Sequence, residues 1–333
     1  MNAPMEARPT GSISRERDLL ALRGMDAREI RRLVRLAADP AALREDENPL
    51  IGRIVANLFF EDSTRTRLSF SVAAQRLGAR VVDLAGPGSS VSKGESLVDT
   101  ALTVEAMGVS ALVVRCKQSG GAELISHAVD IGVINAGDGR HEHPTQGLLD
   151  ILTLAKATGR LSTLDFSGMT LAIVGDIESS RVARSNIAGM GALGARVVCV
   201  GPAGMAPASL STLGCEVSPD LDGVLAQADA VMMLRIQFER HEDSARGAGG
   251  VPMKSSLESI REYRAGYALT RERHAVMKRG AFVMHPGPMN RGVEIDAEVA
   301  DAPNSLILTQ VARGVDVRMA VLLDRLRPEL TRG

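Results

Sequence analysis

The sequence has no tryptophan, and aromatic residues make up only 2% of its 333 residues. Proteins that bind single-stranded nucleic acid usually stack bases on aromatic side chains, so this composition argues against that role. The three cysteines, Cys116, Cys199 and Cys215, lack a C-x-x-C spacing. This spacing argues against a disulfide framework or a zinc site and is typical of a reducing compartment.

Long apolar segments are also missing. No run approaches the roughly 18 apolar residues that a membrane span requires. Residues 1–14 lack the apolar stretch of a signal peptide. We therefore expect a soluble, cytoplasmic protein with no membrane partner.

The sequence has no large excess of positive or negative charge. The 39 basic and 40 acidic residues give a formal net charge of -1, whereas a nucleic-acid-binding protein usually carries a strong basic excess. We therefore expect no nucleic-acid partner. The hydrophobic fraction of 45% is ample for sizeable cores. A chain of 333 residues is too long for one ordinary core, which favours two domains.

Short apolar runs alternate with helical patterns along the chain. In the first half the patterns predict helices at residues 63–77 and 95–107, and strands at residues 54–60, 81–84, 111–115 and 133–135. In the second half they predict strands at residues 171–174, 196–200, 230–234 and 281–284. Such alternation indicates right-handed βαβ crossovers and parallel sheets.

The expected fold class is α/β, with two doubly wound parallel-sheet domains joined by interdomain helices. Pro144 suits the first turn of a helix that runs to about residue 157, so we place the first domain at residues 1–143 and the second at residues 144–305. A helix within residues 306–333 is expected to pack back on the first domain. The polar, Gly-rich segment 238–256 is typical of a lid, a binding loop or a disordered segment.

The sequence Ser63-Thr64-Arg65-Thr66-Arg67 opens a predicted helix directly after a predicted strand. Backbone N–H groups at a helix start, aided by the helix dipole, form a ready anion site. The hydroxyls add donors, and Arg65 offers a planar fork to phosphate oxygens. An ordinary helix cap with two exposed arginines is the alternative. The grouping of hydroxyl side chains with two arginines at one strand-to-helix turn favours phosphate binding.

Further candidates follow in the first half. Lys93 lies in a flexible loop at residues 89–95, where an ordinary exposed lysine is the better reading on spacing alone. Arg115 ends a predicted strand, where open α/β sheets place ligand groups, although such an arginine can also form a surface ion pair. His143 begins a helix, whose dipole disfavours the imidazolium, so a neutral ring could donate to a substrate carbonyl. Gln146, one turn on, faces the same side.

Two apparent motifs are set aside. His141 and His143 form a His-x-His pair, but no third ligand cluster stands out, so we expect no metal. Residues 189–194 match G-x-G-x-x-G, yet they close a predicted helix instead of opening one after a strand. We therefore expect no dinucleotide and no other cofactor.

The second half supplies more cations at strand ends. Arg181 lies at a strand-to-helix turn, and Arg235 follows the predicted strand 230–234. The sequence His285-Pro286-Gly287-Pro288 predicts a rigid turn whose carbonyls could accept hydrogen bonds.

Together, residues 63–67, residues 89–95, Arg115 and His143-Pro144-Thr145-Gln146 resemble the aspartate/ornithine carbamoyltransferase family. The resemblance extends from about residue 19 to about residue 326. It implies an N-terminal carbamoyl-phosphate domain, a C-terminal amino-acid domain, and a homotrimer with active sites at subunit boundaries. It leaves open whether a regulatory chain or a dihydroorotase joins the trimer in a larger assembly.

The second half distinguishes between the amine substrates. Arg235-x-Gln237-x-Glu239-Arg240 and His285-Pro286-Gly287-Pro288 are similar to the aspartate members, and the His-Cys-Leu-Pro and Ser-Met-Gly motifs of the ornithine members are absent. Carbamoyl phosphate and aspartate are anions, and five candidate cations could match them: Arg65, Lys93, Arg115, Arg181 and Arg235. An ornithine site needs an acidic or polar pocket instead.

The expected reaction transfers the carbamoyl group from carbamoyl phosphate to the α-amine of L-aspartate, a step of de novo pyrimidine biosynthesis. The products are N-carbamoyl-L-aspartate and phosphate. A transcarbamoylase for ornithine or another amine is the first alternative. A non-catalytic scaffold is the second, and it is disfavoured because every chemical position is filled.

The resemblance also implies a role for each residue. The carbamoyl-phosphate set is Ser63, Thr64, Arg65, Thr66, Ser89, Arg115, His143, Gln146, Pro286 and Gly287. The aspartate set is Lys93, Arg181, Arg235, Gln237, Gly287 and Pro288. Thr66, Arg115, His143 and Lys93 are the catalytic members, with Ser89 and Lys93 entering from the neighbouring subunit. Glu61 is expected to contact Arg181 and Arg240 when the domains close.

Overall fold

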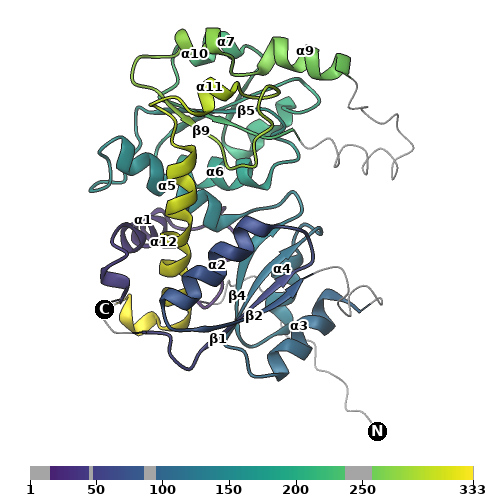
Figure 1. The fold of residues 1–333 in the computed structure, drawn as a ribbon, viewed down its shortest axis with the longest axis vertical. Coiled ribbons are helices and arrows are strands. Elements are labelled where there is room, and N and C mark those ends of the chain that lie inside the picture. The colour runs from purple at the N-terminus through teal and green to yellow at the C-terminus, as the bar shows by residue number, and fades with distance from the viewer. Residues whose placement is uncertain (1–15, 45–47, 86–94, 237–256, 333) are drawn as a thin grey trace.

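The computed structural model describes residues 16–44, 48–85, 95–236 and 257–332. Two α/β lobes lie one above the other along the long axis of the molecule (Figure 1). Helices α5 (Pro144–Ala157) and α12 (Ile307–Leu326) lie where the lobes meet, with α12 running from one lobe into the other. The expected α/β class with two parallel sheets is confirmed.

The sheet of the first lobe has the strand order β2-β1-β3-β4, and every pairing is parallel. Its strands are β1 (Ile54–Phe59), β2 (Arg80–Ala85), β3 (Ala111–Cys116) and β4 (Gly132–Asp138). The helices between them are α2 (Thr64–Arg76), α3 (Leu97–Ala106) and α4 (Gly121–Ala128). Each expected strand is present, but β4 extends three residues beyond the end of the expected segment. The sequence did not predict this extension because its residues, Ala-Gly-Asp, carry no strand-forming signal.

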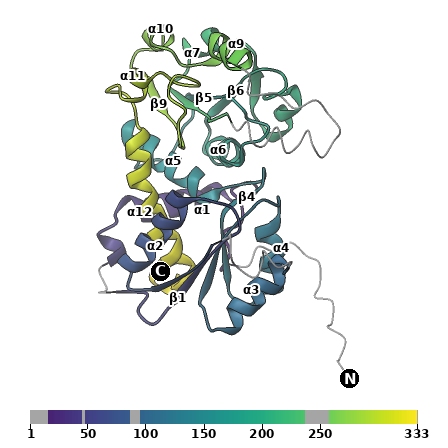
Figure 2. The same ribbon diagram turned by 45° about the vertical axis from the view of Figure 1, so that its right-hand side comes forward.

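Both faces of this sheet are covered, as parallel sheets require. Ala56 and Leu58 share an apolar core with residues of α3 and α4, whereas Val55 packs in the core that includes Phe70 of α2. Figure 2 shows α3 and α4 on one side of the sheet and α2 and α12 on the other. The alternation along β1 therefore sends neighbouring side chains into opposite layers.

The sheet of the second lobe has the order β7-β6-β5-β8-β9, again parallel throughout. Its strands are β5 (Thr170–Val174), β6 (Arg196–Val200), β7 (Glu216–Ser218), β8 (Ala230–Met233) and β9 (Phe282–Met284). The helices are α6 (Arg181–Ala192), α7 (Leu221–Leu225), α9 (Leu257–Tyr267), α10 (Arg271–Ala275) and α11 (Ala297–Ala300). The sequence patterns did not predict β7, whose three residues Glu-Val-Ser are too few and too polar for a strand signal.

In both sheets the strand order reverses beside the first strand of the lobe. The reversal lies between β1 and β3 in the first lobe and between β5 and β8 in the second. In doubly wound sheets, ligands bind outside the carboxyl ends of the strands at such a point. The segments after these four strands are the places where the fold positions functional groups.

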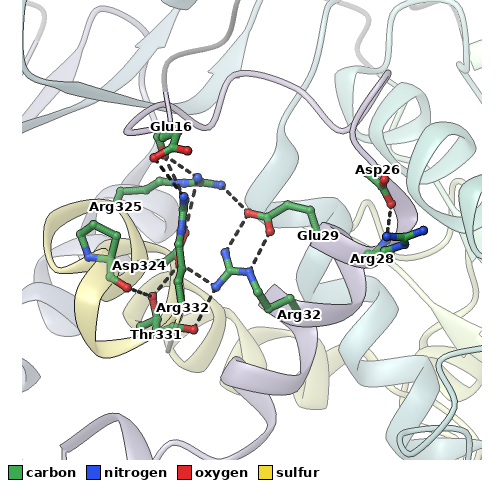
Figure 3. Close-up of polar contacts among 10 residues, drawn as sticks. Glu16, Asp26, Arg28, Glu29, Arg32, Asp324, Arg325, Thr331 and Arg332 are labelled. Carbon is green, nitrogen blue, oxygen red and sulfur yellow. Dashed lines mark hydrogen bonds and ion pairs between the residues drawn. The ribbon is translucent and has the colours of Figure 1, made fainter.

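Helix α12 returns to the first lobe and is fastened there to α1 (Ala27–Ala38) by an ion-pair network (Figure 3). Arg32 lies 2.7 Å from both Glu29 and the buried carboxylate of Asp324, and Arg325 lies 3.4 Å from Glu29. Burial opposes ionisation of Asp324, but hydrogen bonds from Arg32 and Arg332 outweigh it and lower its pKa to about 2. The carboxylate therefore stays charged and holds the helix end in place.

Within the described part of the chain, no helix combines the length and the apolar character needed to cross a membrane.

Candidate active site

A cavity of about 930 Å³ lies between the two lobes. Its size is within the range of small-molecule sites. Its walls come from the segments after β1, β3, β5, β8 and β9 and from α5 and α12. Of the described residues, seven Lys or Arg side chains line it, against the carboxylates of Glu61 and Asp62. A cavity with this excess of cations is suited to anionic ligands.

Helix α2 points its N-terminus into this cavity. Ser63 is the N-cap, and among the described residues its side chain makes no capping hydrogen bond, so the hydroxyl is left for a ligand. Ser63, Thr64, Arg65 and Thr66 all line the cavity. The sequence-predicted anion site is thus brought to the cavity at the start of the helix, where the backbone N–H groups and the dipole favour negative charge. Leu68, by contrast, is 61% exposed on the outer face of α2.

Arg115 reaches the same cavity from the end of β3. Its Nη1 donates to the carbonyl oxygen of Ala136 at 3.3 Å, and its Nε lies 3.7 Å from Glu61 Oε2. Its side chain is 13% exposed. The guanidinium is held in place on one side and faces the cavity on the other.

His143 is the N-cap of α5, and its backbone N–H donates to Ser185 Oγ at 2.9 Å. Its buried Nδ1 has no hydrogen-bond partner among the described residues, and the residue lines the cavity. Complete burial, followed by the charges of Arg318, Arg115 and Arg181, lowers the pKa of this imidazole well below its usual value. The ring is therefore neutral at physiological pH, and the causes are burial and the neighbouring arginines, whereas the sequence had suggested the helix dipole.

The pKa values of His143 and His141 should be shifted in opposite directions. The hydrogen bond to Asp138 raises the pKa of His141, so His141 stays protonated at higher pH than an ordinary histidine. His143 has a lowered pKa and gains a proton only at more acidic pH. Nitrogen-15 NMR of the two rings should show a neutral His143 and a largely protonated His141 at pH 6. A protonated His143 at that pH contradicts the assigned environment.

Arg181, the first residue of α6, joins the two lobes. Its Nη1 and Nη2 donate to Glu61 Oε2 and Oε1 at 2.8 and 3.0 Å. The side chains of Arg181 and Glu61 are 6% and 19% exposed, so this bidentate pair is partly desolvated. The expected contact between Glu61 and Arg181 is therefore present across the cavity.

Arg235 enters the cavity after β8 and lies near Arg65 of α2. Burial and, next, the positive charge of Arg235 lower the pKa of Arg65. Two guanidinium groups that lie near each other repel, and an anion bound close to both offsets that repulsion. Their proximity in one cavity is suited to an anionic ligand.

Pro286, Gly287 and Pro288 line the cavity after β9. Gly287 has a φ of 66°, a left-handed conformation that favours glycine, and a Cβ there would also displace the guanidinium of Arg65. The Gly287 N–H donates to His285 Nδ1 at 2.8 Å, which fixes the turn.

Four of the sequence-predicted residues, Ser89, Lys93, Gln237 and Arg240, lie outside the described residues. The structure brings the others to one cavity, including Gln146 on α5. No group of three or more His, Cys, Asp or Glu side chains in residues 16–44, 48–85, 95–236 and 257–332 is placed to hold a metal ion.

Sequence reasoning missed the contribution of α12. Gln310, Gly314 and Arg318 line the cavity from one face of this helix. Arg318 donates to Ser69 Oγ at 2.7 Å and stacks over Phe70, and burial lowers its pKa to about 10. The available signal was the spacing of Gln310 and Arg318, which lie two turns apart on one face of a helix expected to pack against the first domain.

Two family models match the chain. Residues 17–156 match the carbamoyl-P binding domain of aspartate/ornithine carbamoyltransferases, and residues 167–324 match the Asp/Orn binding domain. The fold and the cationic cavity between the lobes are those of a carbamoyltransferase. The chain belongs to the aspartate/ornithine carbamoyltransferase family.

Among its relatives are aspartate carbamoyltransferase catalytic subunits. The chain is 49% identical to that of Gluconacetobacter diazotrophicus, with 96% of each chain covered. It is 52% identical to that of Thermobifida fusca, with 82% of each covered.

Two solved structures are similar. One is the aspartate transcarbamoylase of Trypanosoma cruzi in complex with N-(phosphonacetyl)-L-aspartic acid, with a TM-score of 0.77, 29% identity, and 93% and 95% of the two chains covered. The other is the catalytic subunit of M. jannaschii aspartate transcarbamoylase, with a TM-score of 0.76, 30% identity, and 94% and 98% of the two chains covered.

Proposed function

We propose that this chain is an aspartate carbamoyltransferase, which converts carbamoyl phosphate and L-aspartate into N-carbamoyl-L-aspartate and phosphate. The observation that carries this proposal is the pairing of two cationic half-sites in one cavity. The N-terminus of α2 with Arg65 lies on one lobe, and Arg181 and Arg235 come from the other. Relatives about half identical over nearly the whole chain bear the same name.

Each half-site binds one of the two substrates, so each lobe is assigned one substrate. Residues 1–143 form the carbamoyl-phosphate domain and residues 144–305 the aspartate domain, with the segment 306–333 completing the first. The phosphate is held by Ser63, Thr64, Arg65 and Thr66, supported by Arg115. This assignment is favoured by the unused Ser63 hydroxyl at the helix start.

The reaction requires no side-chain nucleophile. The neutral α-amine of aspartate attacks the carbamoyl carbon, a C–N bond forms, and the bond from that carbon to the phosphate oxygen breaks. The departing phosphate takes the amine proton. Thr66, Arg115 and neutral His143 donate to the carbamoyl oxygen and stabilise the charge that develops on it. Catalysis rests on orientation and charge stabilisation.

Arg181 and Arg235 bind the aspartate carboxylates, together with Gln237. Glu61 occupies only part of the Arg181 donor set, since the guanidinium has further N–H groups for a substrate carboxylate. Gln146 and the carbonyl groups of Pro286 and Gly287 orient the carbamoyl nitrogen. Their common position on the cavity wall supports this role.

A bisubstrate analogue with a phosphonate and two carboxylates tests both half-sites together. Calorimetry should show binding at least about 100-fold tighter than for phosphonoacetate or succinate alone, since the linked groups bind as one molecule. Arg235→Ala should weaken binding of the analogue but not of phosphonoacetate. An analogue that binds no tighter than its phosphonate half contradicts the proposal.

We further propose a homotrimer in which Ser89 and Lys93 of one subunit complete the site of its neighbour, on the strength of the family membership.

Mixing two inactive variants tests the shared site. Lys93→Ala and Arg115→Ala subunits, dissociated and reassembled together, should regain about a quarter of wild-type activity, because some sites receive intact residues from both subunits. Each variant taken through the same treatment alone is the control. No recovery in mixed trimers contradicts a shared site.

A further inference from the structure

Asp150 lies on α5, one turn beyond Gln146, and is 1% exposed. Its carboxylate accepts hydrogen bonds from three side-chain amides. Oδ1 accepts from Gln146 Nε2 at 2.9 Å and from Gln310 Nε2 at 2.8 Å, and Oδ2 accepts from Asn186 Nδ2 at 2.8 Å. One buried carboxylate thus ties together α5, α6 and α12.

The contact determines which end of the Gln146 amide faces the substrate. An ionised carboxylate only accepts hydrogen bonds, so the group that Gln146 turns toward Asp150 must be its NH2. Gln146 also lines the cavity. Its Oε1 is therefore the part of the amide left for a donor in the cavity, and the NH2 of a carbamoyl group is such a donor.

A second branch leads from Asp150 to the turn after β9. Gln310 donates its NH2 to Asp150, and its Oε1 accepts from the backbone N–H of His285 at 2.9 Å. His285 Nδ1 in turn accepts from the Gly287 N–H at 2.8 Å, and its Nε2 lies 3.1 Å from Glu294 Oε1. Asp150 is therefore connected to the turn that presents the Pro286 and Gly287 carbonyls.

The charge on Asp150 is maintained by its surroundings. Burial raises its pKa to about 6, while hydrogen bonds from Asn186, Gln310 and Gln146 and the charge of Arg318 oppose that rise. The carboxylate is mostly ionised at neutral pH, which is the state that accepts from all three amides.

We propose that Asp150 is a positioning residue for the carbamoyl nitrogen, because it orients both Gln146 and, through Gln310 and His285, the Pro286–Gly287 turn. This inference rests on the proposed function. Asp150 itself is fully buried and acts through the side chains that line the cavity.

Asp150→Asn keeps the shape but turns an NH2 toward at least one of the three amide donors. We expect kcat to fall about 10- to 100-fold, as for the loss of an outer partner that orients a functional group. The inhibition constant of inorganic phosphate should change little, because the start of α2 is untouched. Thr153→Val, in the same buried helix, is the matched control and should leave kcat unchanged.

A double-mutant cycle distinguishes positioning from general destabilisation. If Asp150 acts through Gln146, then Asp150→Asn should lower kcat less in a Gln146→Ala background than in the wild type, so that the total loss in the double mutant is smaller than the product of the two single losses. Losses that multiply fully, or a wild-type kcat for Asp150→Asn, overturn the inference.

Gln146→Glu tests the same contact with Asp150 in place, should Asp150→Asn not fold. It puts a second carboxylate beside Asp150, so its kcat should fall below that of Gln146→Ala. If Asp150 does not orient residue 146, the new carboxylate still offers an acceptor, and Gln146→Glu should be the more active of the two. A wild-type enzyme that forms no carbamoyl-aspartate overturns the proposed function, which is a separate outcome.

Discussion

Replacing Arg115 with alanine should lower kcat by about a thousandfold, the largest loss expected from any single residue in the described cavity. Arg115 is proposed to contact both the phosphate and the carbamoyl oxygen, so its guanidinium stabilises the leaving group and the developing oxyanion together. The contact with the Ala136 carbonyl and the proximity of Glu61 hold it ready in that place. Such preorganised charge acts most strongly in the transition state.

Steady-state kinetics with saturating carbamoyl phosphate measure this effect. Arg115→Lys is the matched control, because it keeps the charge and loses the planar fork. It should retain more activity than Arg115→Ala and less than the wild type. A kcat within about threefold of wild type for Arg115→Ala contradicts the assigned role.

Replacing Glu61 with glutamine should raise the aspartate KM about 30- to 100-fold and also lower kcat. Glu61 and Arg181 form a bidentate ion pair that connects the lobes across the cavity. This pair orients the guanidinium that is proposed to bind aspartate. Removing one partner of a partly buried pair leaves the other charge uncompensated. Both aspartate binding and closure of the lobes should suffer.

Kinetics give the KM, and small-angle X-ray scattering with the bisubstrate analogue measures closure. Glu178→Gln is the matched control, since Glu178 pairs with Arg184 at 3.7 Å and is 37% exposed. It should behave as wild type. An unchanged aspartate KM for Glu61→Gln would rule out the proposed role of the pair.

Local patterns predicted the parts of the site that depend on local structure. The Ser63–Arg67 motif follows a strand and starts a helix, and Arg115 ends a strand, so each could be placed from its neighbours in sequence. Gly287 was placed from its flanking prolines, although its close approach to Arg65 was not foreseen.

The parts that depend on tertiary contacts could not be predicted. Asp150 and Gln310 are 160 residues apart and meet only because α12 crosses to α5. In the sequence, residues 306–326 read as a helix that packs on the first domain, and the spacing of Gln310 and Arg318 did not by itself show that this face reaches the cavity. Glu61 was assigned to Arg181 by the family resemblance, since the two are 120 residues apart.

The identity of the product tests the central claim most directly. The enzyme is incubated with carbamoyl phosphate labelled at the carbonyl carbon and with L-aspartate or L-ornithine, and products are resolved by mass spectrometry. We predict labelled N-carbamoyl-L-aspartate in an amount equal to the phosphate released, and no labelled citrulline. Labelled citrulline, or phosphate release without carbamoyl-aspartate, would contradict the account.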